Sequence, residues 1–586
     1  MPMITKQELV PNDVPSLAET LAKAKDEVAT VTVGTTLFMK KYGVTSEAEY
    51  KKRMAAQGKV MHHAHIGWNS WEETAKGFRY IYDELTNKRG ITLDRFGIAL
   101  DWVMGVPEEM RDLVMKGGSL IFETPEEWKA VGQVVPVQPH FGDHMIGSLN
   151  STENAKLALS AGVTTMGNIA QYYTYEYPGG LMTKEDRVIN MTTAIGMMAQ
   201  FNDHGALIHS NLDDGFGAMF HDLANLCGWA MIERYIVEDL LGARLSHCFG
   251  NLFSDPMLRI TFLLAMDAIN THHSMGSMLY GNTIDFSADY DRNYAALSSF
   301  VLADTCGQLI KPTGHAVTPI PITEAIRIPS ADEIVQVHVV AHMLEEKATY
   351  YQAYLDREKL NAQKDILVAG GKVFFERVMN GLDEMGIDTK NPNELFLALK
   401  ALGPAKLEEQ FGAGKADPHA MRGHIPIKPT DIVATIDHKK DEICKHIGNL
   451  EHSLDKTNAV VACTDVHEFG KEIVKAILLK AGMKIFDLGA NVSPKEVVDT
   501  VIETESKFVL ISTFNGIALT YGKDLLADLK EEGLHDVTVI MGGLLNENMD
   551  GQSLPVDVGD TLTHLGVICS KDADGLIDII KSHVSS

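Results

Sequence analysis

The chain has 586 residues, which is long for a single core and predicts two or more domains. A formal net charge of −27 disfavours nucleic acid and anionic membranes as partners, and no apolar run reaches the roughly 18 residues of a membrane span. Six scattered cysteines without a Cys-x-x-Cys pair disfavour a disulfide framework or a zinc ribbon, and no secretory leader is evident, so a cytoplasmic protein is expected.

The first part of the chain predicts a helical extension followed by a barrel. Residues 1–60 are expected to form two polar helices outside the main fold. From about Val60 to Val340, short apolar runs alternate with amphipathic ones, which predicts a (β/α)8 barrel, although a large doubly wound sheet gives a similar pattern. With a helical tail, this domain spans 61–425. The predicted strands include Arg95–Leu100, Gln133–Gln138, Gly162–Met166, Gly205–His209, Ala243–Cys248 and Gly307–Ile310.

The last part of the chain predicts a second α/β domain. Residues 426–457 are rich in charge and are expected to be a linker to a domain at 458–586. Five strand–helix units predict a flavodoxin-like parallel sheet, whose ligands bind beyond the carboxyl ends of the strands. The predicted strands are Ala459–Thr464, Lys484–Leu488, Phe508–Ser512, Thr538–Met541 and Gly566–Cys569. The predicted helices are Lys471–Ala481, Pro494–Glu503, Tyr521–Glu532, Gly559–Leu565 and Asp574–Ser582.

Loops at the predicted strand ends of this domain carry residues suited to a metal cofactor. The first loop reads Asp465-x-His467-x-x-Gly470, in which Asp465 could accept the Nδ1 proton of His467 and leave Nε2 free for a metal. The plain alternative is a histidine that caps the following helix, and a zinc site lacks further ligands nearby. The other two loops hold Ser512, Phe514 and Gly516, and then Gly542 and Gly543, whose missing side chains would let a flat ligand approach the backbone.

These loops, in this order, resemble the cobalamin-binding domain of B12 enzymes in which a protein histidine is the lower ligand of cobalt. The sequence departs from that pattern at Phe514, where the family carries leucine. The resemblance implies that His467 binds cobalt and that Asp465 supports it. It also implies that the cofactor site includes Gly470, Ser512, Phe514, Gly516, Gly542 and Gly543.

The barrel region is similar to the large subunit of glutamate mutase in three segments, Tyr173–Pro178, His272–Gly276 and Lys311–His315. The resemblance implies that Lys311 contacts the adenosine ribose, although His315 replaces a family glutamate. It also implies that Tyr177 hydrogen-bonds a substrate carboxylate. The cofactor would then be adenosylcobalamin.

Other positions depart from glutamate mutase. Gly167 stands where that family holds the substrate ammonium with a carboxylate, and the family's arginine clamp is not evident. Because an unpaired buried cation is costly, we expect a small carboxylic acid without an α-amino group, with 2-methyleneglutarate as a candidate. Histidines at predicted strand ends, namely His65, His140 and His144, are expected to line the site. Asp213 and Asp214 could belong to a site or to a plain turn.

The resemblance as a whole predicts an adenosylcobalamin-dependent radical carbon-skeleton mutase. The expected partner is a small molecule, and the chain is expected to form a homodimer or homotetramer. Alternatives are a corrinoid-dependent methyltransferase, a glutamate mutase or aminomutase, and a non-enzymatic cobalamin-binding protein.

Overall fold

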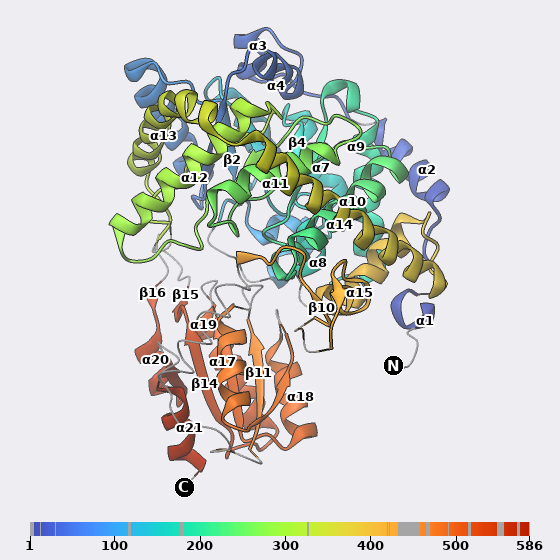
Figure 1. Ribbon diagram of the computed structural model, residues 1–586, viewed down its shortest axis with the longest axis vertical. Helices are drawn as coiled ribbons and strands as arrows, with labels where there is room; N and C mark the ends of the chain where they lie inside the picture. The colour runs from blue at the N-terminus through green and yellow to red at the C-terminus, as the bar shows by residue number, and fades with distance from the viewer. Residues whose placement is uncertain are drawn as a thin grey trace. The chain divides into compact units, whose positions relative to one another are not determined.

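The computed structural model consists of two compact units that divide after Asp431 (Figure 1). None of the helices in its described part combines the length and apolar character needed to cross a bilayer. The described residues are 5–11, 13–29, 31–114, 116, 119–175, 177, 181–324, 327–418, 420, 422–431, 454, 457–464, 469–489, 492–513, 517–547, 556–570 and 575–584.

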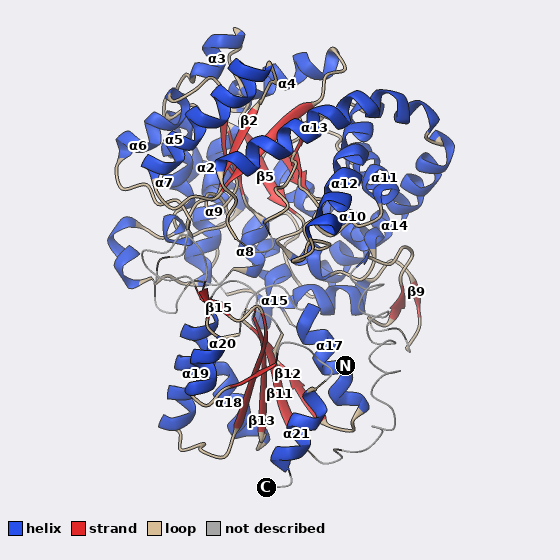
Figure 2. Ribbon diagram, turned by 90° about the vertical axis from the view of Figure 1, so that its left-hand side faces the viewer, coloured by secondary structure: helices blue, strands red, loops and turns tan. Residues whose placement is uncertain are grey.

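The first unit is a nearly closed barrel of eight parallel strands, which confirms the predicted fold class (Figure 2). The strand order is β6-β5-β4-β3-β2-β1-β8-β7, and a single bridge between Phe249 and Leu279 joins the ends of β6 and β7. The strands are β1 (Met61–Ile66), β2 (Arg95–Ile98), β3 (Gln138–Phe141), β4 (Thr165–Gly167), β5 (Leu207–Asn211), β6 (Leu245–Cys248), β7 (Met278–Leu279) and β8 (Ala316–Val317).

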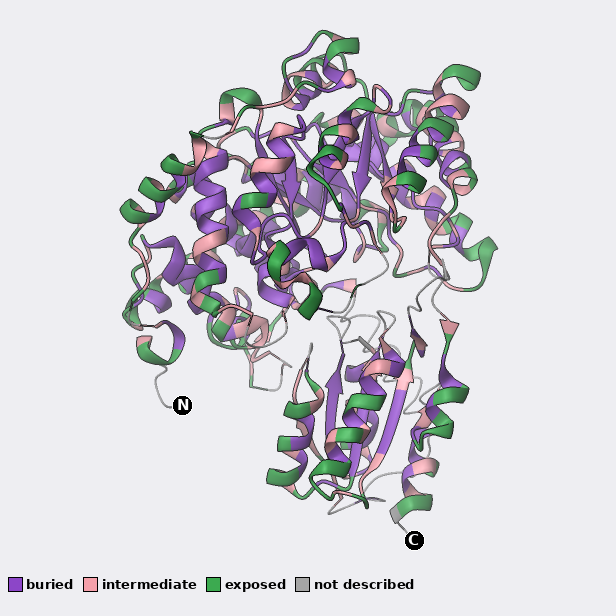
Figure 3. Cartoon of the chain, turned by 180° about the vertical axis from the view of Figure 1, so that it is seen from behind, coloured by how far each residue is buried: buried purple, intermediate pink, exposed green. Residues whose placement is uncertain are grey.

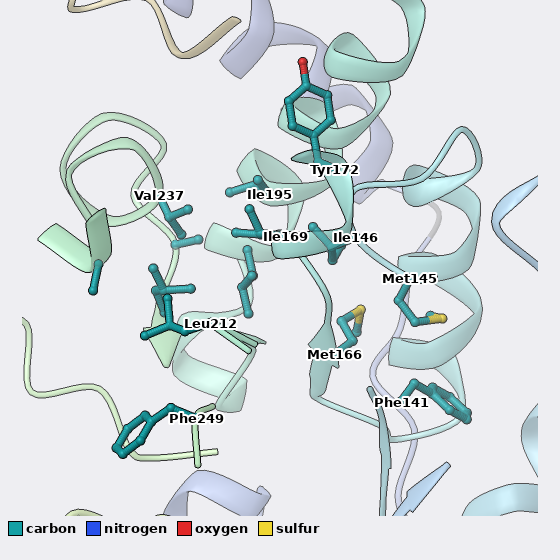
Figure 4. Packing of buried hydrophobic residues seen from close by; sticks show 14 of the residues in the cluster. Phe141, Met145, Ile146, Met166, Ile169, Tyr172, Ile195, Leu212, Val237 and Phe249 are labelled. Atoms are coloured by element: carbon teal, nitrogen blue, oxygen red, sulfur yellow. The ribbon is translucent and has the colours of Figure 1, made fainter. Parts of the chain in front are cut away.

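Helices surround this barrel, and the outward side chains of the strands pack against them. Phe96 of β2 stacks on Phe78 of α5, with ring centroids 4.0 Å apart. Figure 3 shows the barrel strands as buried and the exposed residues on the outer helices, and Figure 4 shows Phe141 and Met166 among the buried apolar side chains. The helices are α5 (Trp71–Tyr82), α6 (Pro125–Ala130), α7 (Ser151–Ser160), α8 (Ala170–Thr174), α9 (Lys184–Ala199), α10 (Leu223–Arg234), α11 (Pro256–Ala268), α12 (Tyr290–Ile310) and α13 (Ala331–Tyr351). The tail adds α14 (Arg357–Glu384), α15 (Pro392–Phe411) and the strands β9 (Lys415–Ala416) and β10 (His424–Ile425).

The N-terminal segment differs from its prediction. It contains α1 (Lys6–Leu9), α2 (Leu17–Val28), α3 (Leu37–Tyr42) and α4 (Glu47–Ala56). Phe38 of α3 and Tyr50 of α4 pack with Met61 and Ala316, which begin β1 and β8. α3 and α4 therefore cover the amino end of the barrel, whereas α1 packs against α15 and α2 against α9. The segment looked polar in the sequence because α4 carries charges that the fold buries, as at Lys51.

Two predicted strands of the barrel also differ. The run Gln133–Gln138 was placed too early, since β3 begins at Gln138. The run Gly307–Ile310 is the last turn of α12, and β8 follows it. A Cβ on Gly307 would lie 2.8 Å from Leu263 of α11, so this glycine serves close helix packing. Because β7 and β8 have two residues each, their apolar runs are too short to recognise by periodicity.

The second unit contains the predicted flavodoxin-like sheet, with parallel strands in the order β12-β11-β13-β14-β17. These are β11 (Asn458–Cys463), β12 (Lys484–Asp487), β13 (Phe508–Thr513), β14 (Thr538–Gly543) and β17 (Ile568–Ser570). The helices are α17 (Phe469–Lys480), α18 (Pro494–Thr504), α19 (Ala518–Glu531), α20 (Gly559–His564) and α21 (Leu576–Val584). A small hairpin of β15 (Asn546–Glu547) and β16 (Val556–Asp557) was not predicted.

Candidate functional site

The carboxyl edge of the second sheet aligns the loops singled out in the sequence. Cys463 pairs with Ser512, and Ser512 pairs with Gly542 across the parallel strands β11, β13 and β14. The backbone N–H of Thr464 donates to the carbonyl oxygen of Ser512 at 2.9 Å. A Cβ on Gly470, at the start of α17, would lie 2.8 Å from the hydroxyl oxygen of Ser512. Gly470 and Ser512 therefore lie so close together that a side chain at position 470 would require the Ser512 hydroxyl to move.

The glycine pair at the end of β14 is required by the sheet itself. Gly543 has a φ of +93°, and a Cβ there would lie 2.3 Å from the carbonyl oxygen of Thr513. A Cβ on Gly542 would lie 2.9 Å from the carbonyl oxygen of Ser570 on β17. Both glycines thus admit a neighbouring backbone, which is a local reason for their presence in addition to the ligand approach predicted from the sequence.

Four predicted cofactor residues, Asp465, His467, Phe514 and Gly516, lie outside the described residues, and their roles stay predictions. Ser512 and the glycine pair lie together at the carboxyl edge of the sheet. Ser512 is half-buried with its hydroxyl at the edge of the sheet, and Gly470, Gly542 and Gly543 present backbone there. Within the described ranges, no group of three or more His, Cys, Asp or Glu side chains could hold a metal ion by itself.

The carboxyl end of the barrel gathers a second set of polar side chains. We call Asp143, Asp213, Asp214 and Glu324 the carboxylate cluster, because they follow β3, β5 and β8 at the same end of the barrel. The Nδ2 atom of Asn168 donates to Asp214 at 2.9 Å, and the Nε2 atom of Gln171 donates to Asp143 at 3.0 Å.

The carboxylate cluster is electrostatically unusual. Burial, followed by the charge of Asp214, raises the pKa of Asp143 to about 7. Burial also raises the pKa of Asp213 and that of Glu324 to about 7. Tyr280, which follows β7, lies near the same carboxylates. The pKa of its hydroxyl is raised first by burial and then by the charges of Glu324, Asp214 and Asp143. These interactions place the cluster around one region of the barrel end.

The three predicted histidines occupy different levels of the barrel. His65, in β1, meets Tyr280 edge-on with centroids 5.6 Å apart, and burial lowers its pKa to about 4. His144 follows β3 in a left-handed conformation, and burial together with Arg187 lowers its pKa to about 3. His140 was expected after a strand end but lies within β3, fully buried, with Nδ1 3.0 Å from the carbonyl oxygen of Thr165.

Sequence reasoning missed a histidine layer inside the barrel. The ring of His140 packs edge-on to those of His63 and His209, with centroids 5.8 Å and 5.1 Å away. A Cβ on Gly97 would lie 2.1 Å from His63, and one on Gly167 would lie 2.5 Å from His209, so these glycines make room for the rings. The sequence offered one signal for this layer. His63 and His65 are two residues apart in a predicted strand, so their side chains lie on the same face of it.

Two other predicted residues lie elsewhere in the barrel unit. Lys311 directly follows α12 and precedes β8, so it lies at the amino end of the strands, where it forms a 3.0 Å ion pair with Asp267. The structure therefore corrects its expected position among the carboxyl-end loops. Tyr177 packs in an apolar cluster with Val103, and the guanidinium of Arg187 lies 5.1 Å from its ring centroid. Its substrate contact stays a prediction.

Comparison with known proteins bears on the second unit. Residues 456–561 match the B12 binding domain family. The chain is 38% identical over 81 residues to the glutamate mutase sigma subunit of Carboxydothermus hydrogenoformans, covering 14% of this chain and 59% of that protein. It is 36% identical over 80 residues to dimethylamine corrinoid protein 3 of Methanosarcina acetivorans, covering 14% of this chain and 38% of that protein. The chain thus spans less than two thirds of these curated relatives.

A solved cobalamin-binding protein from Desulfitobacterium hafniense DCB-2 also matches, at 20% identity and a TM-score of 0.20, over 37% of this chain and 97% of that one. A TM-score this low carries no argument. The family match covers the strands β11, β13 and β14, whose carboxyl ends carry the residues singled out in the sequence. The C-terminal unit is a B12-binding domain related to the glutamate mutase sigma subunit and to corrinoid proteins, and the chain binds cobalamin through it.

Proposed function

We propose that this chain is an adenosylcobalamin-dependent radical mutase, in which the barrel binds the substrate and the C-terminal domain binds the cofactor. The observation that carries the proposal is the presence, on one chain, of a B12-binding domain and a barrel whose carboxyl end holds buried polar groups. In barrels of this kind the active site lies at the carboxyl end of the strands. The similarity to a glutamate mutase subunit supports the same reaction class.

Specific residues would hold the cofactor. Ser512, Gly542 and Gly543 line the edge where its nucleotide tail would lie, and His467 would bind cobalt with Asp465 behind it. When bound, adenosylcobalamin would supply the radical chemistry for a rearrangement of the substrate. The buried walls of the barrel would exclude water, and its hydrogen-bonding side chains would fix the orientation of the migrating group.

The test uses adenosylcobalamin that carries deuterium on its 5′ carbon. The full chain is incubated in the dark with the labelled cofactor and a panel of small amines, amino acids and carboxylic acids. We expect deuterium in one substrate and its isomer, and a cobalt(II) electron paramagnetic resonance signal that depends on that substrate. Turnover with methylcobalamin, without deuterium transfer, would contradict the mutase.

A corrinoid methyltransferase is the second candidate, because dimethylamine corrinoid proteins from Methanosarcina match the C-terminal domain at 34–36% identity. In this case the barrel would deliver a methyl group to or from the domain. Incubation of the cob(I)alamin-loaded chain with methylated amines separates the candidates: a new methyl–cobalt absorbance spectrum supports the methyltransferase, and an unchanged spectrum argues against it.

A further inference from the structure

We infer that His140 accepts a hydrogen bond from the substrate, whose hydroxyl or amine N–H lies in the space that Gly142 leaves beside the imidazole. The reaction performed on this substrate rests on the proposed function, but the binding argument rests on the barrel alone. The substrate class is therefore a small molecule that carries a hydroxyl or an amine.

The contact that His140 makes inside the barrel fixes the role of each ring nitrogen. Its Nδ1 lies 3.0 Å from the carbonyl oxygen of Thr165, and because a carbonyl oxygen only accepts, Nδ1 carries the proton. Burial, and then Arg95 and neighbouring histidines, hold the pKa of His140 well below 6.5, so the ring is neutral. In a neutral imidazole the second nitrogen has a lone pair and no proton. The Nε2 atom is therefore an acceptor, and only a donor can satisfy it.

This acceptor is buried and has no partner in the described part of the chain. The side chain of His140 is 0% exposed, and none of the described residues forms a hydrogen bond with its Nε2. The two histidines that pack edge-on against the ring, His63 and His209, do not reach this atom. A buried polar atom that lacks a hydrogen bond is costly, so a donor is expected at Nε2.

Gly142, which directly follows β3, leaves space at this nitrogen. Among the described residues, a Cβ placed on Gly142 would have a single atom within 4 Å, the Nε2 of His140 at 3.7 Å. The backbone of Gly142 does not have a positive φ, so its conformation does not require glycine. Gly97 and Gly167 differ, because histidine rings fill the space beside them. The packing of the barrel thus gives no reason for a glycine at position 142, whereas a ligand group at Nε2 does.

The register of the strands places this position where a substrate would lie. His65 pairs with Gly97 and Gly97 pairs with His140, so these residues share one level of the barrel, one residue before the carboxyl ends of β1, β2 and β3. The Nδ1 atom of His65 is likewise buried and unpartnered among the described residues. In barrels of this kind substrates bind at the carboxyl end of the strands. A polar substrate group at this level would lie between two imidazoles that need hydrogen bonds.

Calorimetric titration of the cobalamin-free full chain tests the inference without requiring turnover. The probes are 3-hydroxybutanoate, 4-hydroxybutanoate and 4-aminobutanoate, each compared with butanoate, which lacks the donor. We expect at least one of the three to bind at least ten-fold more tightly than butanoate. Preference for a hydroxybutanoate assigns the donor as a hydroxyl, which agrees with the expected substrate without an α-amino group, and preference for 4-aminobutanoate assigns it as an amine.

Two variants make the assignment specific. His140→Phe keeps an aromatic ring but removes Nε2, and Gly142→Ala fills the space beside it, so each should weaken binding of the preferred probe at least ten-fold. Gly142→Ala should not lower the thermal unfolding temperature, since its methyl group meets no close contact and the backbone suits alanine. Gly575→Ala is the matched control, because a Cβ at Gly575 also has no described atom within 4 Å, and it should leave binding unchanged.

Three results would overturn the inference. They are equal or tighter binding of butanoate, no binding by any donor-bearing probe, and unchanged affinity for the preferred probe in Gly142→Ala. The first two would mean that water alone satisfies Nε2. If His140→Phe unfolds, Gly142→Ala decides the question. If a donor-bearing probe binds as expected but no deuterium is transferred from the cofactor, the proposed mutase fails and this inference stands.

Discussion

Glu47, on α4, forms an ion pair with the Nε atom of Arg95, on β2, at 2.8 Å, and the side chains of Arg95 and Glu47 are 1% and 2% exposed. The same carboxylate oxygen lies 2.8 Å from the Nζ atom of Lys51, and its other oxygen accepts from the hydroxyl of Thr165. Lys51 in turn donates to the carbonyl oxygen of Gly276. One carboxylate therefore pairs with two buried cations and joins α4 to strands of the barrel.

Glu47→Gln should destabilise the barrel unit strongly. The substitution keeps the size of the side chain but removes the carboxylate that pairs directly with Lys51 and Arg95, and breaking a buried pair in this way typically costs about 3–5 kcal/mol. Urea unfolding followed by circular dichroism measures the change. Glu49→Gln is the matched control, because Glu49 pairs with Arg53 on the exposed face of the same helix, and a much smaller effect is expected. Equal losses of unfolding free energy in Glu47→Gln and Glu49→Gln would show that the buried ion pairs of Glu47 stabilise the fold no more than the exposed pair of Glu49.

Gly470→Ala should weaken cobalamin binding, since the new methyl group would lie 2.8 Å from the hydroxyl oxygen of Ser512. The next atom of Ser512 lies 3.9 Å away, at an ordinary contact distance. The double variant Gly470→Ala/Ser512→Ala should therefore regain stability relative to Gly470→Ala alone. Cobalamin titration by absorbance and thermal unfolding measure the two effects. Additive losses in the double variant would argue against the contact.

Gly543→Ala should cost more than Gly533→Ala, although both glycines have a positive φ. A new Cβ at position 533 would have no atom within 4 Å, so Gly533→Ala measures only the cost of placing alanine in a left-handed backbone conformation. That cost is about 1–2 kcal/mol of unfolding free energy. At 543 the Cβ also meets the carbonyl oxygen of Thr513 at 2.3 Å, so the β13–β14 edge must shift. Urea unfolding compares the two variants. A smaller cost at 543 would mean that this edge is easily deformed.

His140→Gln should change how stability depends on pH. Burial, and then Arg95 and neighbouring histidines, hold the pKa of His140 well below its ordinary value of 6.5. Because the unfolded chain binds a proton there and the folded chain does not, His140 costs stability as the pH falls below 6.5, by about 1.4 kcal/mol per unit. The stability advantage of the parent chain over His140→Gln should therefore shrink between pH 7.5 and 5.5.

Urea unfolding at both pH values measures this difference, and the exposed His204→Gln controls for the loss of a histidine. If the difference in free energy of unfolding between the parent chain and His140→Gln were the same at both pH values, the buried ring would accept a proton without a loss of stability.

The sequence predicted most of the architecture where the periodicity was long enough. The five parallel strands of the B12-binding domain, including the Phe508–Thr513 strand, were found because each is flanked by an amphipathic helix. Short elements defeated the same reasoning. The last turn of α12 was predicted as a strand in place of the two-residue β8. Lys311, which follows that turn, was therefore expected at the carboxyl end of the barrel and lies at the amino end.

The barrel site was only partly predictable, because its members come together through strand order and register. His65 and His144 were singled out, and Asp213 and Asp214 were left open between a site and a turn. Asp143 and Glu324 were not singled out, since a single acidic residue in a loop has no local signal. Only closure of the barrel brings loops from β3, β5 and β8 together.

His467→Ala tests the part of the cofactor site that rests on the sequence. If His467 is the lower ligand of cobalt, the variant should bind cobalamin at least ten-fold more weakly, and the cobalt(II) resonance should lose the hyperfine coupling to a histidine nitrogen. His564→Ala, an exposed histidine on α20 of the same domain, is the matched control and should keep both properties. Nitrogen coupling that survives in His467→Ala would assign the ligand elsewhere. Loss of coupling with unchanged affinity would mean that Ser512 and the glycine pair at 542 and 543 dominate binding, as their close strand register allows.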